Sequence, residues 1–97
     1  MKGIIVADDL TGANASGALV KKLGLSVCSL FSLQDAPEVD VLSYSTDSRG
    51  VAPQEAYRRV YDAFTRLGKG ADFCNKRIDS TLRGNIGAEI DGALDAL

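Results

Sequence analysis

Histidine is absent from all 97 residues of the sequence. This removes the side chain that most often serves as a general base near neutral pH, and it excludes a zinc site built on imidazole ligands. Acid–base chemistry therefore has to come from Asp or Glu. Among metal ions, a hard cation such as Mg²⁺ is the one that these oxygen ligands would favour.

Cysteines, basic charge and long apolar runs are also scarce. The two cysteines, Cys28 and Cys74, lie in apolar stretches without a C-x-x-C spacing, so we expect both to be reduced and buried. The net charge of −2 argues against a nucleic-acid partner. Asp8 and Asp9 follow the apolar residues 3–7 at once, which leaves too short a run for a signal peptide. We therefore expect a cytoplasmic protein without a membrane partner, and a homo-oligomer is left open.

The pattern of apolar residues predicts one α/β domain over residues 1–97. Helices that alternate with buried strands favour a three-layer sandwich with a mainly parallel sheet, here truncated after a helix. The expected strands are 2–7, 25–33, 39–45 and 71–76, with a turn over 34–38, and the expected helices are 12–23, 53–67 and a last one from 86.

Capping residues and apolar stripes give more detail on the helices. Thr11 is a candidate N-cap of the first helix, Pro53 suits the first position of the second, and Asn85 could cap the last. The second helix has an apolar stripe formed by Ala56, Val60, Phe64 and Leu67. A stripe is also expected on the last helix, formed by Ile86, Ile90, Ala93 or Leu94, and Leu97.

Polar clusters follow three of the predicted strands, at residues 8–13, 45–50 and 76–85. The carboxyl ends of parallel strands meet at one edge of a sheet, and ligands of open α/β folds bind there. The spacing therefore predicts one site that is built from all three clusters.

The first two clusters each allow a functional and a purely structural interpretation. The carboxylates of Asp8 and Asp9 repel each other unless a cation or hydrogen-bond donors meet them, but Asp9 or Thr11 could also only cap the helix. Arg49, two residues after Asp47, could hold a substrate carboxylate in a bidentate fork, or this segment could be only a turn.

The third cluster is the most informative. It places three cations and several hydrogen-bonding side chains just before a helix N-terminus, where free N–H groups favour an anion. We interpret it as a site for an anion that carries several hydroxyls; the alternative is a solvated loop, and Arg77 could face outward. The cations are Lys76, Arg77 and Arg83, and the other side chains are Asp79, Ser80 and Thr81.

The segments IIVADDLTGA, STDSRG and KRIDSTLRGNIGAE resemble the motifs of the four-carbon acid sugar kinases, in the same order and spacing. The resemblance spans essentially the whole chain. It implies an N-terminal domain that binds a sugar acid such as threonate, erythronate or an oxo-tetronate, and a C-terminal domain that carries ATP for phosphorylation of a substrate hydroxyl. One departure is Ala15, where the family often has an acid. By motif match, substrate binding is expected of Asp8, Asp9, Arg49, Lys76, Asp79, Ser80 and Arg83.

The resemblance also implies what this chain lacks. The sequence contains neither G-x-x-x-x-G-K-[ST] nor G-x-G-x-x-G, the loops that cradle phosphates. We therefore expect ATP and Mg²⁺ to serve only the full-length enzyme, whose missing C-terminal domain would be the partner of this fragment. The fragment itself is expected to bind no cofactor and to have no kinase activity.

Carboxylates are the candidates for the base that takes the hydroxyl proton. We rank Asp9 first, with Asp8 as its substitute and Asp79 as the competitor. Asp79 is flanked by Lys76 and Arg83, which would keep it ionised and make it a poorer base.

A response-regulator receiver domain is the alternative from another functional class. It too begins with a strand that ends in two acids, and its phosphoacceptor aspartate ends the third strand, where Asp47 stands here. However, the chain is short for that fold, and the third cluster has no counterpart in it. Labelling of Asp47 by a small phosphodonor with Mg²⁺ would favour the receiver.

Overall fold

The computed structural model describes residues 2–30, 33, 38–78 and 84–97. Its elements follow the predicted order: β1 (Gly3–Ala7), α1 (Leu10–Lys21), β2 (Val27–Leu30), β3 (Val41–Ser45), α2 (Pro53–Leu67), β4 (Phe73–Arg77) and α3 (Ile86–Ala96). The four strands form one sheet in the order β2-β3-β1-β4, and every pair is parallel. The predicted α/β class is confirmed.

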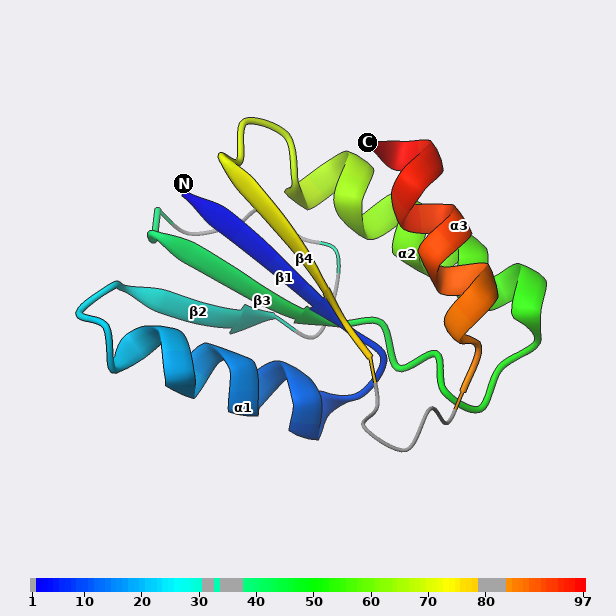
Figure 1. Ribbon diagram of the computed structural model, residues 1–97, viewed down its shortest axis with the longest axis horizontal. Coiled ribbons are helices and arrows are strands. Elements are labelled where there is room, and N and C mark those ends of the chain that lie inside the picture. Colours follow the sequence, from blue (N-terminus) through cyan, green and yellow to red (C-terminus); the bar gives the residue numbers. More distant parts are fainter. Residues whose placement is uncertain (1, 31–32, 34–37, 79–83) are drawn as a thin grey trace.

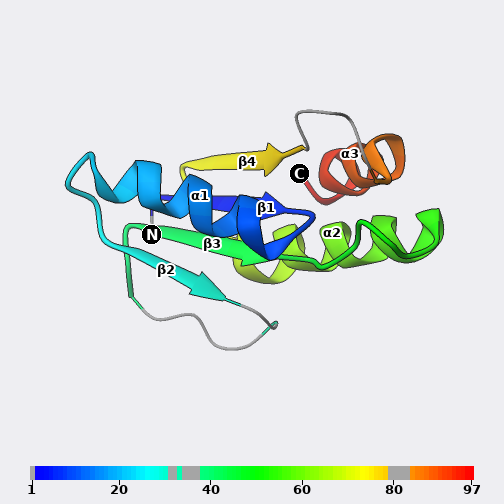
Figure 2. The ribbon, with the colours of Figure 1, turned by 90° about the horizontal axis from the view of Figure 1, so that it is seen from below.

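Helices cover both faces of this sheet (Figures 1 and 2). α1 packs on one face, and α2 lies on the other with α3 against it. The side chains of the strands alternate between these layers. Val6 joins the core with Val60 and Phe64 of α2, whereas Ser43 faces α1 and donates a hydrogen bond of 2.6 Å to Ala13 O. The arrangement is the three-layer sandwich that the sequence predicts.

The first helix begins two residues earlier than predicted, because Asp9 and not Thr11 is its N-cap. Asp9 Oδ1 accepts a hydrogen bond of 2.8 Å from Gly12 N. Thr11 lies exposed within the first turn, so its predicted capping role is wrong, and Asp9 caps the helix instead. Further along, Gly17 lets the helix lie close to the sheet, since a Cβ there would be 3.2 Å from Val27 Cγ1.

The apolar stripe is correctly predicted for α2 but not for α3. All four predicted residues of α2 are buried. On α3, Ile90, Leu94 and Leu97 are 40, 67 and 68% exposed. The buried residues of this helix are Glu89, Gly92 and Ala93. Close packing is the cause, because a Cβ on Gly92 would lie 2.6 Å from the backbone oxygen of Tyr57 on α2.

Smaller differences concern single residues and strand ends. Asn85 is the N-cap residue of α3, as predicted, but its side chain makes no capping hydrogen bond. Within the described residues β2 spans only Val27–Leu30, and the turn expected over 34–38 lies outside them except for Glu38. Cys28 and Cys74 are free, as predicted, but they are half-buried rather than buried. None of the described helices has the length and apolar character needed to cross a membrane.

Candidate functional site

Two adjacent carboxylates and one arginine form the centre of the candidate site. Asp8 follows β1 and is only 3% exposed. Arg49 donates from Nε to Asp8 Oδ2 and from Nη2 to Asp8 Oδ1, both at 3.2 Å, and its Nη2 lies 3.3 Å from Asp9 Oδ2. The guanidinium therefore offsets the repulsion between the two acids. The first two predicted clusters meet at this point.

The loop after β3 brings Arg49 to the acids by running along the end of β1. Thr46 N and Ser48 N donate to the carbonyl oxygens of Ala7 and Asp8, at 2.9 and 3.0 Å. Between them, Asp47 has a φ of 48°, a left-handed conformation that is unfavourable for most residues with a side chain. Asp adopts this conformation more readily than most residues, and contacts from other elements help the loop to hold its shape.

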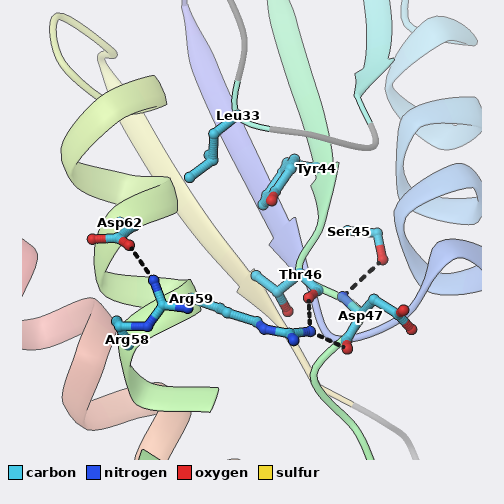
Figure 3. A pocket seen from close by; sticks show the side chains of 8 residues that line it. All are labelled: Leu33, Tyr44, Ser45, Thr46, Asp47, Arg58, Arg59 and Asp62. Carbon is cyan, nitrogen blue, oxygen red and sulfur yellow. Dashed lines mark hydrogen bonds and ion pairs between the residues drawn. The ribbon is translucent and has the colours of Figure 1, made fainter. Parts of the chain in front are cut away.

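A second arginine provides one such contact from α2 (Figure 3). Arg59 Nη1 donates to the carbonyl oxygens of Thr46 and Asp47 at 3.1 and 2.8 Å, and its Nε donates to Glu55 at 3.0 Å. The side chain thus spans from the helix to the loop and supports the left-handed residue.

The same arginine borders a pocket of about 410 Å³ on the α2 side of the sheet (Figure 3). Burial raises the pKa of the Tyr44 phenol in this pocket, an effect that Arg59 opposes and Asp62 adds to. The phenol therefore keeps its proton near neutral pH and can donate a hydrogen bond. The pocket is lined by Leu33, Tyr44, Ser45, Thr46, Asp47, Arg58, Arg59 and Asp62.

The last two residues of β4 point to opposite sides of the sheet. Lys76 faces α3, where Nζ lies 3.0 Å from Glu89 Oε1, and it also donates to the Arg77 carbonyl at 2.7 Å. Arg77 faces α1, where Nη1 donates to Ser16 Oγ at 2.9 Å. A Cβ on Gly12 would lie 3.3 Å from Arg77 Nε, so this guanidinium passes over the start of the helix. Arg77 is therefore half-buried and does not point straight into solvent.

Gly84 joins the third cluster to the first two. Its φ is 90°, and a Cβ there would lie 3.1 Å from Asp8 Oδ2 and 3.2 Å from Arg49 Cγ. The predicted site residues Asp79, Ser80 and Arg83 lie outside the described part of the chain. Among the described ones, Asp8, Asp9 and Arg49 are in direct contact, and Lys76 lies on the α3 side of β4 with its side chain 10% exposed.

Glu89 is a buried acid that the sequence reasoning missed. Its side chain is 2% exposed, Oε2 accepts a hydrogen bond of 3.0 Å from Ser48 Oγ, and Oε1 is paired with Lys76 without making a hydrogen bond. Ser48 Oγ in turn lies 2.5 Å from Thr46 Oγ1. One signal was available: Glu89 is the last residue of the segment KRIDSTLRGNIGAE that carries the family resemblance, although its burial is not visible there.

Comparison with protein families gives one match over nearly the whole chain. A family described as a sugar-binding N-terminal domain matches residues 3–97. Among curated proteins, a D-erythronate kinase of Heliobacterium modesticaldum is 51% identical over 97% of the chain. A D-threonate kinase of Salmonella typhimurium is 39% identical over 99%, and a 3-oxo-tetronate kinase of Actinobacillus succinogenes is 30% identical over 96%. The chain spans only 23, 24 and 24% of these relatives.

A solved structure has the same fold. It is a crystal structure of a domain of unknown function from Bordetella bronchiseptica, a domain-swapped dimer with bound citrate. It superposes with a TM-score of 0.93 and 34% sequence identity, over 99% of this chain and 26% of that one.

Proposed function

Because the chain belongs to the family of sugar-binding N-terminal domains, we propose that it is the substrate-binding domain of a kinase for four-carbon sugar acids. The enzyme would use ATP to phosphorylate a hydroxyl of an erythronate, threonate or oxo-tetronate, the acids named in its relatives. Residues 1–97 would bind the acid. A nucleotide-binding domain would come from sequence beyond the quarter of the relatives that this chain matches.

The contact of Arg49 with both Asp8 and Asp9 at the carboxyl edge of the sheet carries this proposal. A four-carbon sugar acid offers one carboxylate and several hydroxyls. A guanidinium suits the carboxylate, and aspartates accept hydrogen bonds from the hydroxyls. The side chains of Arg49 and Asp9 are 28 and 30% exposed, so a ligand can reach both. The solved neighbour, of which this chain covers 26%, binds citrate, which like a sugar acid carries carboxylate and hydroxyl groups.

The proposed roles differ with burial. Arg49 would bind the substrate carboxylate and Asp9 its hydroxyls, while the enclosed Asp8 would hold Arg49 in place. Lys76 would influence substrate binding only indirectly, since its charge is already paired with Glu89. Asp79, Ser80 and Arg83 stay in the proposed substrate-binding set by motif match.

ATP and Mg²⁺ belong to the whole enzyme in this proposal. The part of the chain that the structure describes contains no group of three or more acidic or cysteine side chains that could hold a metal ion. Because the sequence has no phosphate-binding glycine loop, the chain alone is expected not to turn over ATP.

The receiver domain, with Asp47 as the phosphoacceptor, finds no support in the comparisons. The family match extends over residues 3–97, and the three named relatives are kinases of sugar acids.

Titration calorimetry on the 97-residue chain tests the proposal. We expect weak binding of D-erythronate or D-threonate and none of erythritol or threitol, the tetritols that lack the carboxylate. Arg49→Ala should abolish the difference between acid and tetritol. Equal binding of acid and tetritol, or no binding of any four-carbon acid at millimolar concentration, would contradict the proposal. ATP hydrolysis above a boiled control would contradict the expected inactivity of the fragment.

A further inference from the structure

The helix α3 holds the loop that carries Arg49. Asn85 Nδ2 donates to the carbonyl oxygens of Ser48 and Val51 at 3.1 and 2.7 Å, so it binds the backbone on both sides of Arg49. One turn later, Glu89 Oε2 accepts a hydrogen bond of 3.0 Å from Ser48 Oγ. The loop is therefore attached to α3 through its backbone and through a side chain.

This attachment acts directly beside the candidate site. Ser48 N donates to Asp8 O at 3.0 Å, so Ser48 lies between the end of β1 and α3. The next residue, Arg49, contacts Asp8 and Asp9. Arg59 holds the backbone before Ser48, and Asn85 and Glu89 hold Ser48 and Val51, so the point from which the Arg49 side chain leaves the loop is fixed.

The burial of Glu89 shows how firmly this attachment is built. Its side chain is 2% exposed, and removal of a carboxylate from water has a large cost unless partners compensate it. The compensation comes from Lys76, whose Nζ lies 3.0 Å away, and from the Ser48 hydroxyl. A buried ion pair of this kind adds little net stability compared with an apolar pair, and in some proteins its role is to fix one geometry of the groups that it joins.

We propose that Glu89 and Asn85 are positioning residues for sugar-acid binding: they anchor residues 48–51 to α3 so that Arg49 faces Asp8 and Asp9. The inference rests on the proposed function, since the ligand is the sugar acid. Neither residue touches the ligand in this proposal. Their effect passes through Arg49.

Glu89→Gln is the main test, with Asp95→Asn as its matched control. Both substitutions turn a carboxylate of α3 into an amide. Asp95 accepts a hydrogen bond of 2.6 Å from the Tyr57 hydroxyl on α2, and among the described residues it makes no hydrogen bond to the loop. Two quantities are measured below the melting transition of each variant: the Kd for D-erythronate, and the NMR resonance of the Arg49 Nε–H group.

We expect Glu89→Gln to raise the Kd about tenfold or more, as small misplacements of binding groups do, and to shift the Arg49 resonance. Asp95→Asn should leave both unchanged. A purely structural role of Glu89 would lower the melting temperature but leave the Kd and the resonance of the folded protein as they are, and this result would overturn the proposal.

Ser48→Ala provides a second, independent arm. It removes the hydroxyl that binds Glu89 and keeps the Lys76–Glu89 pair. It therefore still tests the positioning role of Glu89 if Glu89→Gln does not fold. We expect the same rise in Kd and the same shift of the resonance; unchanged values would overturn the proposal. If the unmodified chain binds no sugar acid, the proposed function fails, whereas the Arg49 resonance still reports whether α3 positions that side chain.

Discussion

Gly84 is a residue of the third cluster that lies against both Asp8 and Arg49. Its φ of 90° alone disfavours any residue with a side chain. We expect Gly84→Ala to cost about 1 kcal/mol of folding free energy from the backbone and, in addition, to weaken sugar-acid binding, because the new methyl group would press on Asp8 Oδ2 and Arg49 Cγ. Urea unfolding and calorimetry measure the two effects.

Gly70→Ala is the control for this substitution. Gly70 has nearly the same φ, 83°, but a Cβ there would meet nothing within 4 Å. It should lose similar stability and keep full affinity. Equal affinities of the two variants would show that the space at Gly84 does not matter for the site.

Asp9 combines two tasks that a substitution can separate. Its Oδ1 caps α1 by accepting a hydrogen bond from Gly12 N, and its Oδ2 lies by Arg49. Asn is as good an N-cap as Asp, so Asp9→Asn should preserve the helix while it removes the charge. If Asp9 is the base, kcat should fall about a hundredfold or more.

The kinetics require a nucleotide domain, which a chimera supplies: residues 1–97 replace the matched segment of the Heliobacterium D-erythronate kinase. Asp79→Asn in the same chimera is the comparison. A binding role would mainly raise KM. If Asp9→Asn keeps kcat and Asp79→Asn abolishes it, the ranking of the two acids is reversed.

Among the elements, α2 and α3 show where apolar patterning predicts burial and where it does not. α2 meets the sheet through Val60 and Phe64, large side chains whose spacing is visible in the sequence. α3 meets α2 at backbone distance, so small residues are buried there and Leu94 is left exposed. Such a close approach depends on the partner helix, and a one-dimensional pattern does not contain it.

The same reasoning applies to the site. The sequence predicts that Asp8, Asp9 and Arg49 gather, because each follows a strand of one parallel sheet. It does not reveal Glu89, since an acid within a helix usually faces solvent and only the folded arrangement shows that Lys76 lies opposite.

Gly92 offers a direct test of the close packing between α2 and α3. A Cβ there would lie 2.6 Å from Tyr57 O and 3.3 Å from Tyr61 N, so Gly92→Ala has to push the helices apart. We expect a loss of about 1–3 kcal/mol, as for other overpacked positions.

Gly87 on the same helix is the control, because a Cβ there would meet nothing within 4 Å. Gly87→Ala should be neutral or stabilising by at most about 1 kcal/mol, because alanine favours helix. Denaturant midpoints that rank the two the other way would refute the packing argument.

At the scale of the whole molecule, stability should fall in acid partly through Glu55. Hydrogen bonds from Arg58 and then Arg59 lower the pKa of Glu55 from 4.5 to about 2. Since the folded state binds this proton less readily than the unfolded chain, the contribution of Glu55 is present above pH 4.5 and is lost as the pH falls towards 2. Melting temperatures of Glu55→Gln should therefore fall less steeply over this range than those of the unmodified protein.

Asp91→Asn, at an exposed position of α3, serves as the control. Identical slopes for the unmodified protein and Glu55→Gln would contradict the expectation.

The central place of β1 has a consequence for how the chain is synthesised. β1 is synthesised before β3 and β4, yet Gly3 pairs with Val41 of β3 on one side and with Phe73 of β4 on the other. Contacts between such distant residues form slowly, because long loops have to close first. Until residues 73–77 have been made, one edge of this apolar strand offers its N–H and C=O groups to any extended peptide nearby. We therefore expect nascent chains to be most prone to aggregation in the interval between the synthesis of β3 and that of β4.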